Sequence, residues 1–275
     1  MITAPEPTRL GDITRFGSVD RADDPAFFVE LVDGLNRLDS VVDCKRRMLD
    51  CLDLGPGEHA LDVGCGTGPD VRAMAARVAP GGTALGIDVS EVMLAEARRR
   101  SEGCGLPVEF RRGDVHRLDL PDASVDACRA ERVLLHVEDH ARAVSEMARV
   151  LRPGGRLAVY DFDLDAWILA GADPAVSRRV LELYLETIRH PHVARELPWL
   201  FRQAGLVDVR VIAQALVAGC DFVATALMGT VTAGVGAGRL AADEVERWLG
   251  DLRTAEADGH FVCAINGLIV TARKP

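Results

Sequence analysis

Short apolar runs alternate with helical stretches along most of the chain. Apolar runs bounded by turn residues predict strands over residues 59–64, 82–89, 108–114, 125–130, 156–162, 207–216 and 263–274. Apolar residues at helical spacing predict helices over 69–80, 90–103 and 139–151, and two more within 174–204. Strands that alternate with helices of this length predict a parallel sheet covered by helices on both faces.

Two regions depart from this alternation. Apolar residues recur at helical spacing between Pro25 and Leu54, ahead of the first strand, and predict two helices. Residues 219–258 are too many for a hairpin turn and predict a glycine-rich apolar piece followed by an amphipathic helix. We interpret this insertion as a helical lid over the carboxyl edge of the sheet, where open α/β sheets bind ligands. The alternative is an insertion that only covers an exposed apolar edge.

These patterns predict two parts of the chain. Residues 1–54 form an N-terminal helical cap segment, and residues 55–275 form a ligand-binding α/β domain that contains the lid insertion at about 219–258. Within the domain, Ser90 is the expected N-cap of the helix that follows the second strand. The Pro153-Gly154-Gly155 stretch predicts a turn before the fifth strand.

Composition narrows the classes of partner. The chain has 275 residues and a formal net charge of −10 at pH 7, which disfavours nucleic acid and anionic membranes and favours a small-molecule substrate. No apolar run is long enough to span a bilayer, and the N-terminal residues show no secretory signal, so we expect a cytoplasmic monomer or homodimer. The seven cysteines form no C-x-x-C pair, and no histidine spacing resembles a metal triad, so we expect no metal.

The stretch "LDVGCGTGPD", residues 61–70, places three glycines at alternating positions directly after a predicted strand. Glycine lets backbone approach a ligand closely, and the following helix offers free N–H groups to an anionic part of that ligand. The NAD fingerprint needs a third glycine where this chain has Pro69, so a nicotinamide dehydrogenase is disfavoured. Asp88 ends the second strand, where a carboxylate can accept hydrogen bonds from two ribose hydroxyls.

Four ordered motifs carry a family resemblance. "ALDVGCGTG", "GIDVSEVML", "RRGDVHRLDLPDASVDA" and "LRPGGRLAV" resemble the motifs of the class I S-adenosylmethionine (SAM) dependent methyltransferases, in particular their ubiquinone-biosynthesis-like small-molecule branch. The resemblance covers about residues 57–161. It implies a Rossmann-like α/β fold with a seven-stranded sheet of order 3-2-1-4-5-7-6, whose last strand is antiparallel. It also implies SAM as the cofactor.

Carried over onto this sequence, the resemblance assigns the following cofactor contacts. The methionine end of SAM is expected against Asp62, Gly64, Cys65, Gly66 and Gly68, its ribose against Asp88, its adenine against Val89, Met93, Asp114 and Val115, and its amino-acid part against Glu131. Other roles are open at three of these positions. Met93 is equally suited to the core, Asp114 to a turn that bonds its own backbone, and Asp62 to bracing the glycine loop.

Methyl transfer from a sulfonium needs positioning first and a base only for a tightly held proton. His136 and Asp161 are predicted near the carboxyl ends of adjacent strands, and their spacing is similar to the proposed base pair of rebeccamycin-type sugar O-methyltransferases. A neutral imidazole held by a carboxylate can take a hydroxyl proton. The alternative is that His136 caps its helix and packs. Glu131 and Arg132 are either functional or an ion pair that shapes the loop after the fourth strand.

The sequence therefore predicts a SAM-dependent methyltransferase that acts on an oxygen or nitrogen of a small, partly hydrophobic metabolite, in natural-product biosynthesis. The apolar lid is the expected specificity element. Three alternatives stay open: a carbon methyltransferase on a quinone or lipid, a methyltransferase-fold cyclase that binds SAM without transferring methyl, and a non-catalytic SAM-binding regulatory module.

Overall fold

A computed structural model describes residues 16–275 of the chain. Its strands are β1 (His59–Val63), β2 (Thr83–Asp88), β3 (Val108–Arg112), β4 (Val125–Glu131), β5 (Leu151–Ala170), β6 (Val207–Ala213), β7 (Leu216–Val217) and β8 (Val262–Arg273). Its helices are η1 (Phe16–Arg21), α1 (Pro25–Asn36), α2 (Asp39–Leu52), α3 (Pro69–Val78), α4 (Glu91–Ser101), α5 (His140–Val150), α6 (Pro174–Leu185), α7 (Val193–Gln203), α8 (Cys220–Gly236) and α9 (Ala242–Ala257). Residues 1–15 of the expected cap segment lie outside the described residues.

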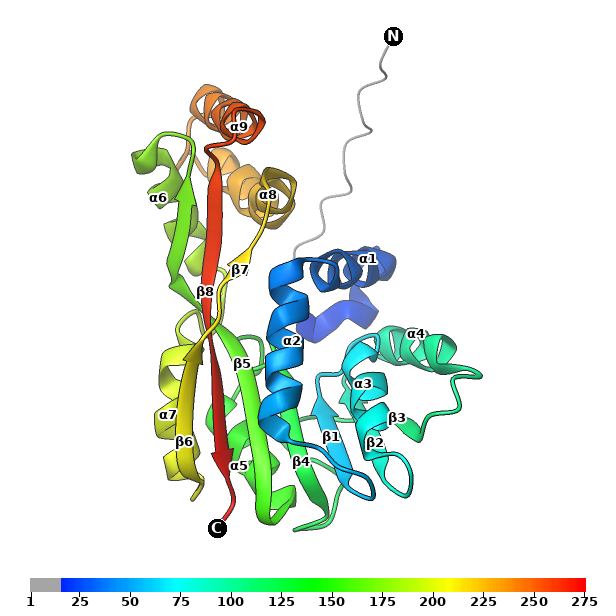
Figure 1. Ribbon diagram of the computed structural model, residues 1–275. Helices are drawn as coiled ribbons and strands as arrows, with labels where there is room; N and C mark the ends of the chain where they lie inside the picture. The colour runs from blue at the N-terminus through cyan, green and yellow to red at the C-terminus, as the bar shows by residue number, and fades with distance from the viewer. Residues whose placement is uncertain (1–15) are drawn as a thin grey trace.

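The strands form one mixed sheet of order β3-β2-β1-β4-β5-β8-β6 (Figure 1). Strands β1 to β5 pair in parallel, whereas β8 runs antiparallel to both β5 and β6. The predicted strand order and the antiparallel last strand are confirmed. The strand predicted over 207–216 is split, because its last residues form the separate short strand β7, which also pairs with β8.

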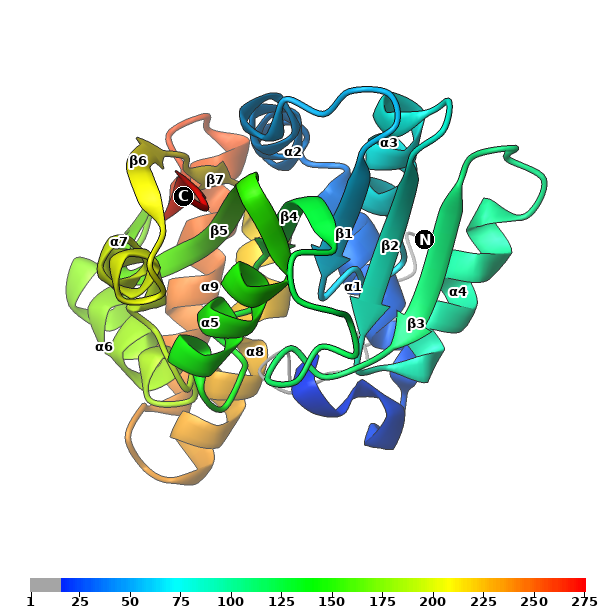
Figure 2. The same cartoon turned by 90° about the horizontal axis from the view of Figure 1, so that it is seen from below.

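Helices cover both faces of the sheet (Figure 2). Helices α2 and α3 pack on one face, and α5 and α7 pack on the other. Successive residues of a strand point to opposite faces, so each buried strand contributes to two cores. In β1, Ala60 belongs to the core under α2 and α3, and Leu61 and Val63 belong to the core under α5 and α7. Both faces are therefore apolar, as the continuous apolar runs predict.

The two longest strands, β5 and β8, continue beyond the edge of the sheet. The strand predicted over 156–162 is too short at both ends, because β5 spans Leu151–Ala170. It pairs with β8 as far as Ala170, which lies opposite Val262. We call residues 162–170 and 262–267 the β5–β8 ribbon. The segment Pro153–Gly155, predicted as a turn, lies inside β5, where its register against β4 shifts.

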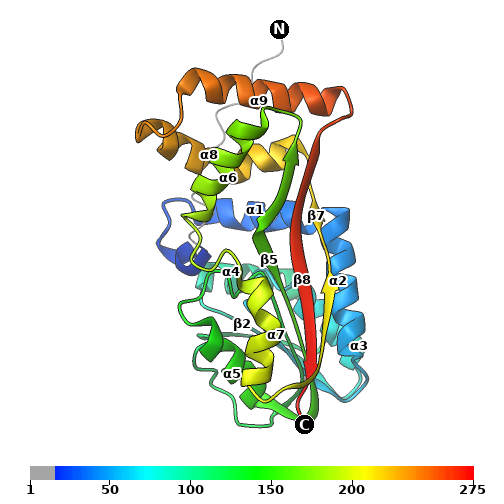
Figure 3. The same cartoon turned by 90° about the vertical axis from the view of Figure 1, so that its left-hand side faces the viewer.

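The ribbon carries α6, α8 and α9, which we call the helical lobe (Figures 1 and 3). The insertion predicted at about 219–258 thus contains two helices, α8 and α9. Its glycine-rich first part is helical and belongs to α8, where small residues allow close packing with neighbouring helices. Trp248 on α9 is 1% exposed, and its indole N–H donates to Ser177 Oγ on α6 at 2.9 Å. The expected amphipathic helix is therefore fixed against α6. Across residues 16–275, no helix is long and apolar enough to cross a bilayer.

Candidate active site

A cavity of about 870 Å³ lies at the carboxyl ends of β1, β2 and β4, between α1 and the helical lobe. Its position is the edge at which open α/β sheets bind ligands. Most of the residues expected at the site line it: Asp62, Gly64, Cys65, Gly66, Asp88, Val89, Met93, Asp114, Val115, Glu131 and His136. Gly68 and Asp161 are not among the lining residues, and each has a structural role described below.

The glycine loop adopts a left-handed backbone at all three glycines. At Gly64 a Cβ atom would lie 2.3 Å from Val133 Cγ2, so glycine is required for contact with the loop after β4. At Gly68 a Cβ atom would lie 2.7 Å from the Phe110 ring, which explains this glycine by packing at the start of α3. At Gly66 a Cβ atom would meet nothing within 4 Å, so this residue leaves open space next to the cavity.

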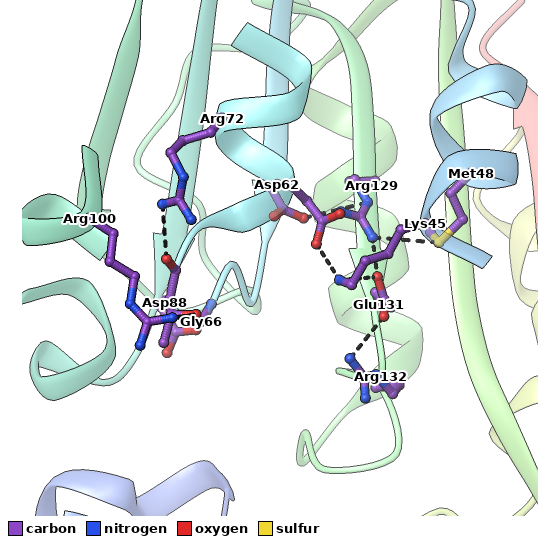
Figure 4. A network of polar contacts seen from close by, with 12 residues as sticks. Lys45, Met48, Asp62, Gly66, Arg72, Asp88, Arg100, Arg129, Glu131 and Arg132 are labelled. Carbon is purple, nitrogen blue, oxygen red and sulfur yellow. Dashed lines mark hydrogen bonds and ion pairs between the residues drawn. The ribbon is translucent and has the colours of Figure 1, made fainter. Parts of the chain in front are cut away.

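Asp88 connects the end of β2 to the glycine loop (Figure 4). Its Oδ2 accepts the Gly66 N–H at 2.8 Å, and its Oδ1 accepts the Ser90 N–H at 2.9 Å. Burial raises the pKa of Asp88 above its usual value, although these two backbone bonds oppose the shift. Each carboxylate oxygen accepts more than one hydrogen bond, so Asp88 can still receive hydroxyl groups of a ligand. Ser90 is the N-cap of α4 as predicted, since its hydroxyl accepts the Met93 N–H.

A buried group of three carboxylates and three cations lies beside the glycine loop (Figure 4). Its centre is Arg129 on β4, which is fully buried on the face of the sheet that α2 and α3 cover. The Arg129 guanidinium lies 2.7 Å from Asp70 Oδ1, 2.5 Å from Glu131 Oε2 and 3.8 Å from Asp62 Oδ1. We call Lys45, Asp62, Asp70, Arg129, Glu131 and Arg132 the charge network.

Lys45 reaches the charge network from α2. Its Nζ lies 2.5 Å from Asp70 Oδ2 and 2.8 Å from Glu131 Oε2, and Arg132 closes the group at 2.9 Å from Glu131 Oε1. Buried ions must be paired, and each of the three cations here lies within 2.9 Å of a carboxylate oxygen. The alternative of an ion pair between Glu131 and Arg132 is therefore confirmed, within a larger group. It holds the N-terminal helix α2 against the methionine end of the expected cofactor site.

The cations decide which of the buried carboxylates stay ionised. Burial raises the pKa of Asp70, but Arg129 and Lys45 outweigh it and hold that pKa well below its usual range. Burial likewise raises the pKa of Glu131, and Lys45 and Arg132 reverse the shift, so the net pKa is lowered. For Asp62, which lies farther from the Arg129 guanidinium, burial prevails and the pKa is raised. Asp70 and Glu131 therefore carry the negative charge of the network.

His136 lines the cavity in the loop between β4 and α5. Its ring centroid lies 5.3 Å from that of Phe16. Burial lowers the pKa of His136 to about 4, and Arg132 adds to the shift, so the imidazole is neutral at neutral pH. Of the alternative role, the helix capping is wrong, because α5 begins at His140 and its N-cap is Asp139, whose side chain accepts the Arg142 N–H, whereas the expected packing is seen in the contact with Phe16.

Asp161 does not contact His136 in the way that the expected base pair requires. It is fully buried, and its Oδ2 accepts the Leu134 backbone N–H at 2.8 Å. Within residues 16–275 no hydrogen bond joins the Asp161 carboxylate to the His136 ring. Burial raises the pKa of Asp161 to about 7. In this structure Asp161 therefore holds the backbone of the loop that carries His136.

The residues expected around adenine line the other end of the cavity. Asp114 Oδ1 accepts the His116 backbone N–H at 2.9 Å and lies 2.6 Å from His116 Nδ1, so the local turn considered for Asp114 is confirmed. Met93 is 3% exposed and packs with Val19 and Phe28, so it belongs to a core and also lines the cavity. In the described part of the chain, no group of three His, Cys, Asp or Glu residues is placed to hold a metal.

The comparisons with known proteins decide the family. Residues 61–159 match the family model described as "Methyltransferase domain". An uncharacterized 37.1 kDa protein in transposon TN4556 of Streptomyces fradiae is 39% identical over 250 residues, which cover 89% of this chain and 71% of that protein. Nocamycin O-methyltransferase of Saccharothrix syringae is 40% identical over 118 residues, 42% of this chain and 41% of that protein. The chain belongs to the class I SAM-dependent methyltransferases.

This methyltransferase is also similar to solved structures. The [4+2]-cyclase SpnF superposes with a TM-score of 0.53 at 26% identity, covering 85% of this chain and 81% of that one. The matches with named methyltransferases span about 28 to 60% of those proteins, from an arsenite methyltransferase of Halobacterium salinarum at 28% to an O-methyltransferase of Penicillium expansum at 60%. The cofactor of the family is SAM.

Sequence reasoning missed three members of the charge network of this methyltransferase: Lys45, Asp70 and Arg129. Arg129 gave a signal, because it interrupts an otherwise apolar buried strand, where a charge must be paired. Asp70 also gave one, since it lies in the first turn of the helix after the glycine loop. Lys45 gave none, because a lysine on an amphipathic helix is ordinarily a solvated residue.

Proposed function

We propose that this methyltransferase transfers the methyl group of SAM to an oxygen or nitrogen of a small, partly hydrophobic metabolite in natural-product biosynthesis. The observation that carries the proposal is the continuity of the cavity. The same cavity is lined by the glycine loop and Asp88, by His136, and by apolar side chains of β5, α6, α8 and β8. The similarity to nocamycin O-methyltransferase favours oxygen.

The residues of the cavity suit the cofactor. The open space at Gly66 leaves room for close approach of a ligand, and Asp88 beside it offers carboxylate oxygens to ribose hydroxyls. The methionine end would lie against Asp62, Gly64, Cys65 and Glu131, where the ionised carboxylate of Glu131 can accept from an ammonium group. Adenine would lie against Val89, Met93, Asp114 and Val115. SAM, when bound, supplies an activated methyl group on a sulfonium.

His136 is the residue that we propose as the base. It lines the cavity and is neutral at neutral pH, so its ring can accept the proton of an acceptor hydroxyl. Asp161 would act through the backbone of the loop, by holding Leu134 and with it the position of His136. We propose further that residues 1–54 serve as a cap, since Lys45 on α2 takes part in the charge network.

A cyclase is the second candidate, and the similarity to SpnF favours it. That similarity covers 85% of this chain and 81% of SpnF, and an apolar cavity would suit the substrate of a cyclisation as well as a methyl acceptor. The two functions differ in their products, because only methyl transfer converts SAM to S-adenosylhomocysteine and makes the acceptor heavier by one methyl group. A carbon methyltransferase would differ from the proposal in the acceptor atom, because the transferred methyl group would be bonded to carbon instead of oxygen or nitrogen.

The test is incubation of the protein with methyl-¹³C SAM and a panel of polar metabolites, phenols and polyketide-like alcohols. We expect S-adenosylhomocysteine and a product with the ¹³C methyl on oxygen or nitrogen, as read by mass spectrometry and NMR. Turnover of the polar metabolites in preference to the apolar alcohols would contradict the proposed acceptor class. An altered product without a label would establish the cyclase instead.

A further inference from the structure

We propose that the part of the cavity between the β5–β8 ribbon, α6 and α8 binds a neutral alcohol built on a rigid apolar ring system, and that Trp167 and Ala226 determine its fit. This inference rests on the proposed function, because the bound alcohol would be the methyl acceptor. We call this part of the cavity the ring subsite. Its lining residues are Phe162, Leu164, Trp167, Tyr184, Phe222, Ala226 and Ile265.

An irregularity in the ribbon brings the side chains of the ring subsite together. Phe162 pairs with Gly267 and Trp167 pairs with Ile265, so residues 163–166 of β5 oppose a single residue of β8. In a regular strand Phe162 and Trp167 would point to opposite faces, because their separation is odd. The bulge removes that constraint, and Phe162, Leu164 and Trp167 all line the cavity. Bulges near active sites commonly redirect a side chain in this way.

The bulge is held from the side away from the cavity. Asp163, which is 7% exposed, accepts from Arg195 Nε at 2.6 Å, and Asp165 Oδ2 lies 3.0 Å from Arg195 Nη2. The Leu164 N–H donates to Pro191 O at 2.9 Å. Helix α7, which carries Arg195, and the preceding loop therefore fix the bulged backbone. A fixed backbone gives the ring subsite a defined shape.

The walls of the ring subsite select against charge. The Trp167 ring meets the Tyr184 ring edge to face, with centroids 5.6 Å apart. The Trp167 indole N–H, its one donor, bonds to Cys263 Sγ at 3.3 Å, so the ring offers only apolar surface to a ligand. The lining residues contributed by β5, β8, α6 and α8 are uncharged, and the nearest charged lining residues along the chain, Glu186 and Arg189, follow the end of α6. A charged acceptor body would lose its hydration without compensation.

The shape of the ring subsite favours rings over chains. Aromatic side chains from β5, α6 and α8 line the same cavity as the small side chain of Ala226, which lies one helical turn after Phe222. Aromatic walls bind ring systems through stacked or edge-to-face contacts, whereas a flexible chain loses more conformational entropy on binding. Between this subsite and the glycine loop, His136 can face a hydroxyl on the ring.

The experiment uses calorimetric titration of 2-naphthol, a neutral bicyclic phenol, into the full chain, with and without saturating S-adenosylhomocysteine. We expect 2-naphthol to bind more tightly than 1-decanol and 2-naphthoate. Ala226→Leu fills the subsite and should weaken 2-naphthol binding about tenfold or more. Trp167→Ala should weaken it similarly. The matched control is Trp199→Ala, which removes an exposed tryptophan of α7 and should leave the affinity unchanged.

The variants separate this inference from the proposed function. Affinity for S-adenosylhomocysteine should be the same in wild type, Ala226→Leu and Trp199→Ala. Equal 2-naphthol binding by wild type and Ala226→Leu, or tighter binding of 1-decanol or 2-naphthoate, would overturn the ring subsite while leaving methyl transfer intact. Absence of S-adenosylhomocysteine binding would overturn the proposed function, and an Ala226-dependent affinity for 2-naphthol would still establish the subsite. Trp167→Ala removes a buried side chain and could fail to fold. In that case the binding measured with Ala226→Leu decides the test.

Discussion

Replacement of Lys45 by methionine tests whether the buried charge network stabilises the fold. Methionine keeps most of the apolar stem and removes the ammonium group, so the change in packing is small. The Lys45 side chain is 15% exposed, and its partners Asp70 and Glu131 are 9% and 6% exposed. Removal takes one cationic partner from each of the two ionised carboxylates, Asp70 and Glu131. Breaking a buried pair in this way costs about 3–5 kcal/mol, and the remaining pairing of Glu131 with Arg129 places Lys45→Met at the lower end.

Arg46 provides the matched control on the same helix. Its pair with Asp43 is exposed, with 61% and 56% of the two side chains accessible, so Arg46→Met should destabilise the fold far less than Lys45→Met does. Urea unfolding of both variants measures the two costs at unchanged m-value. Added salt should reduce the small effect at Arg46 and leave the effect at Lys45 largely unchanged. Equal destabilisation by the two substitutions would refute the reasoning.

The pH dependence of Lys45→Met gives a second readout of the same network. The folded pKa of Asp70 is lowered, so its ion pairs contribute stability above the pKa of the unfolded state, and this contribution is lost as pH falls through the folded pKa. Without Lys45 the carboxylates take up protons at a higher pH. The difference in unfolding free energy between wild type and Lys45→Met should therefore shrink between pH 7 and pH 4. A difference that grows on acidification would contradict this assignment.

Three further predictions concern the cavity. Asp88→Ala should weaken SAM binding by about 1–3 kcal/mol, the scale of hydrogen bonds to a charged group, and calorimetry would show this. The His136 imidazole should show no titration of its ring ¹H NMR shifts between pH 5.5 and 8, because its pKa is about 4, and His136→Gln should lower kcat at unchanged SAM affinity. Asp161 has a pKa of about 7 in the folded state against 3.8 as its ordinary value, so its ionisation opposes folding as pH rises. Between pH 5 and pH 8, wild type should therefore lose roughly 2–3 kcal/mol more stability than Asp161→Asn does, as measured by urea unfolding.

The sheet and the glycine loop were predictable because their signals are local. The apolar runs give the strands, the three glycines and Asp88 follow two of them directly, and the four motifs imply the strand order. A left-handed backbone at Gly64 and Gly66 is what glycine at those positions indicates.

The acceptor side of the cavity was not predictable because its features depend on pairing between distant residues. The bulge in β5 exists only relative to β8, a hundred residues later, and no periodicity of β5 alone reveals it. The His136 and Asp161 pair was inferred from neighbouring strand ends, but strand order does not specify the direction of a side chain. Asp161 faces the backbone N–H of Leu134 instead. Likewise, the charge network joins residues of α2, α3, β1 and β4, which come together only in the folded chain.

The most direct test of the account is calorimetric titration of SAM into the wild-type protein, with Asp88→Asn titrated in parallel. Asparagine keeps the size of the side chain at the end of β2 and removes its charge. We expect one SAM to bind per chain, with clearly weaker binding by Asp88→Asn and an unchanged far-ultraviolet circular dichroism spectrum of that variant. Failure of wild type to bind SAM, or equal affinity of the two proteins, would contradict the assignment of this cavity as the cofactor site.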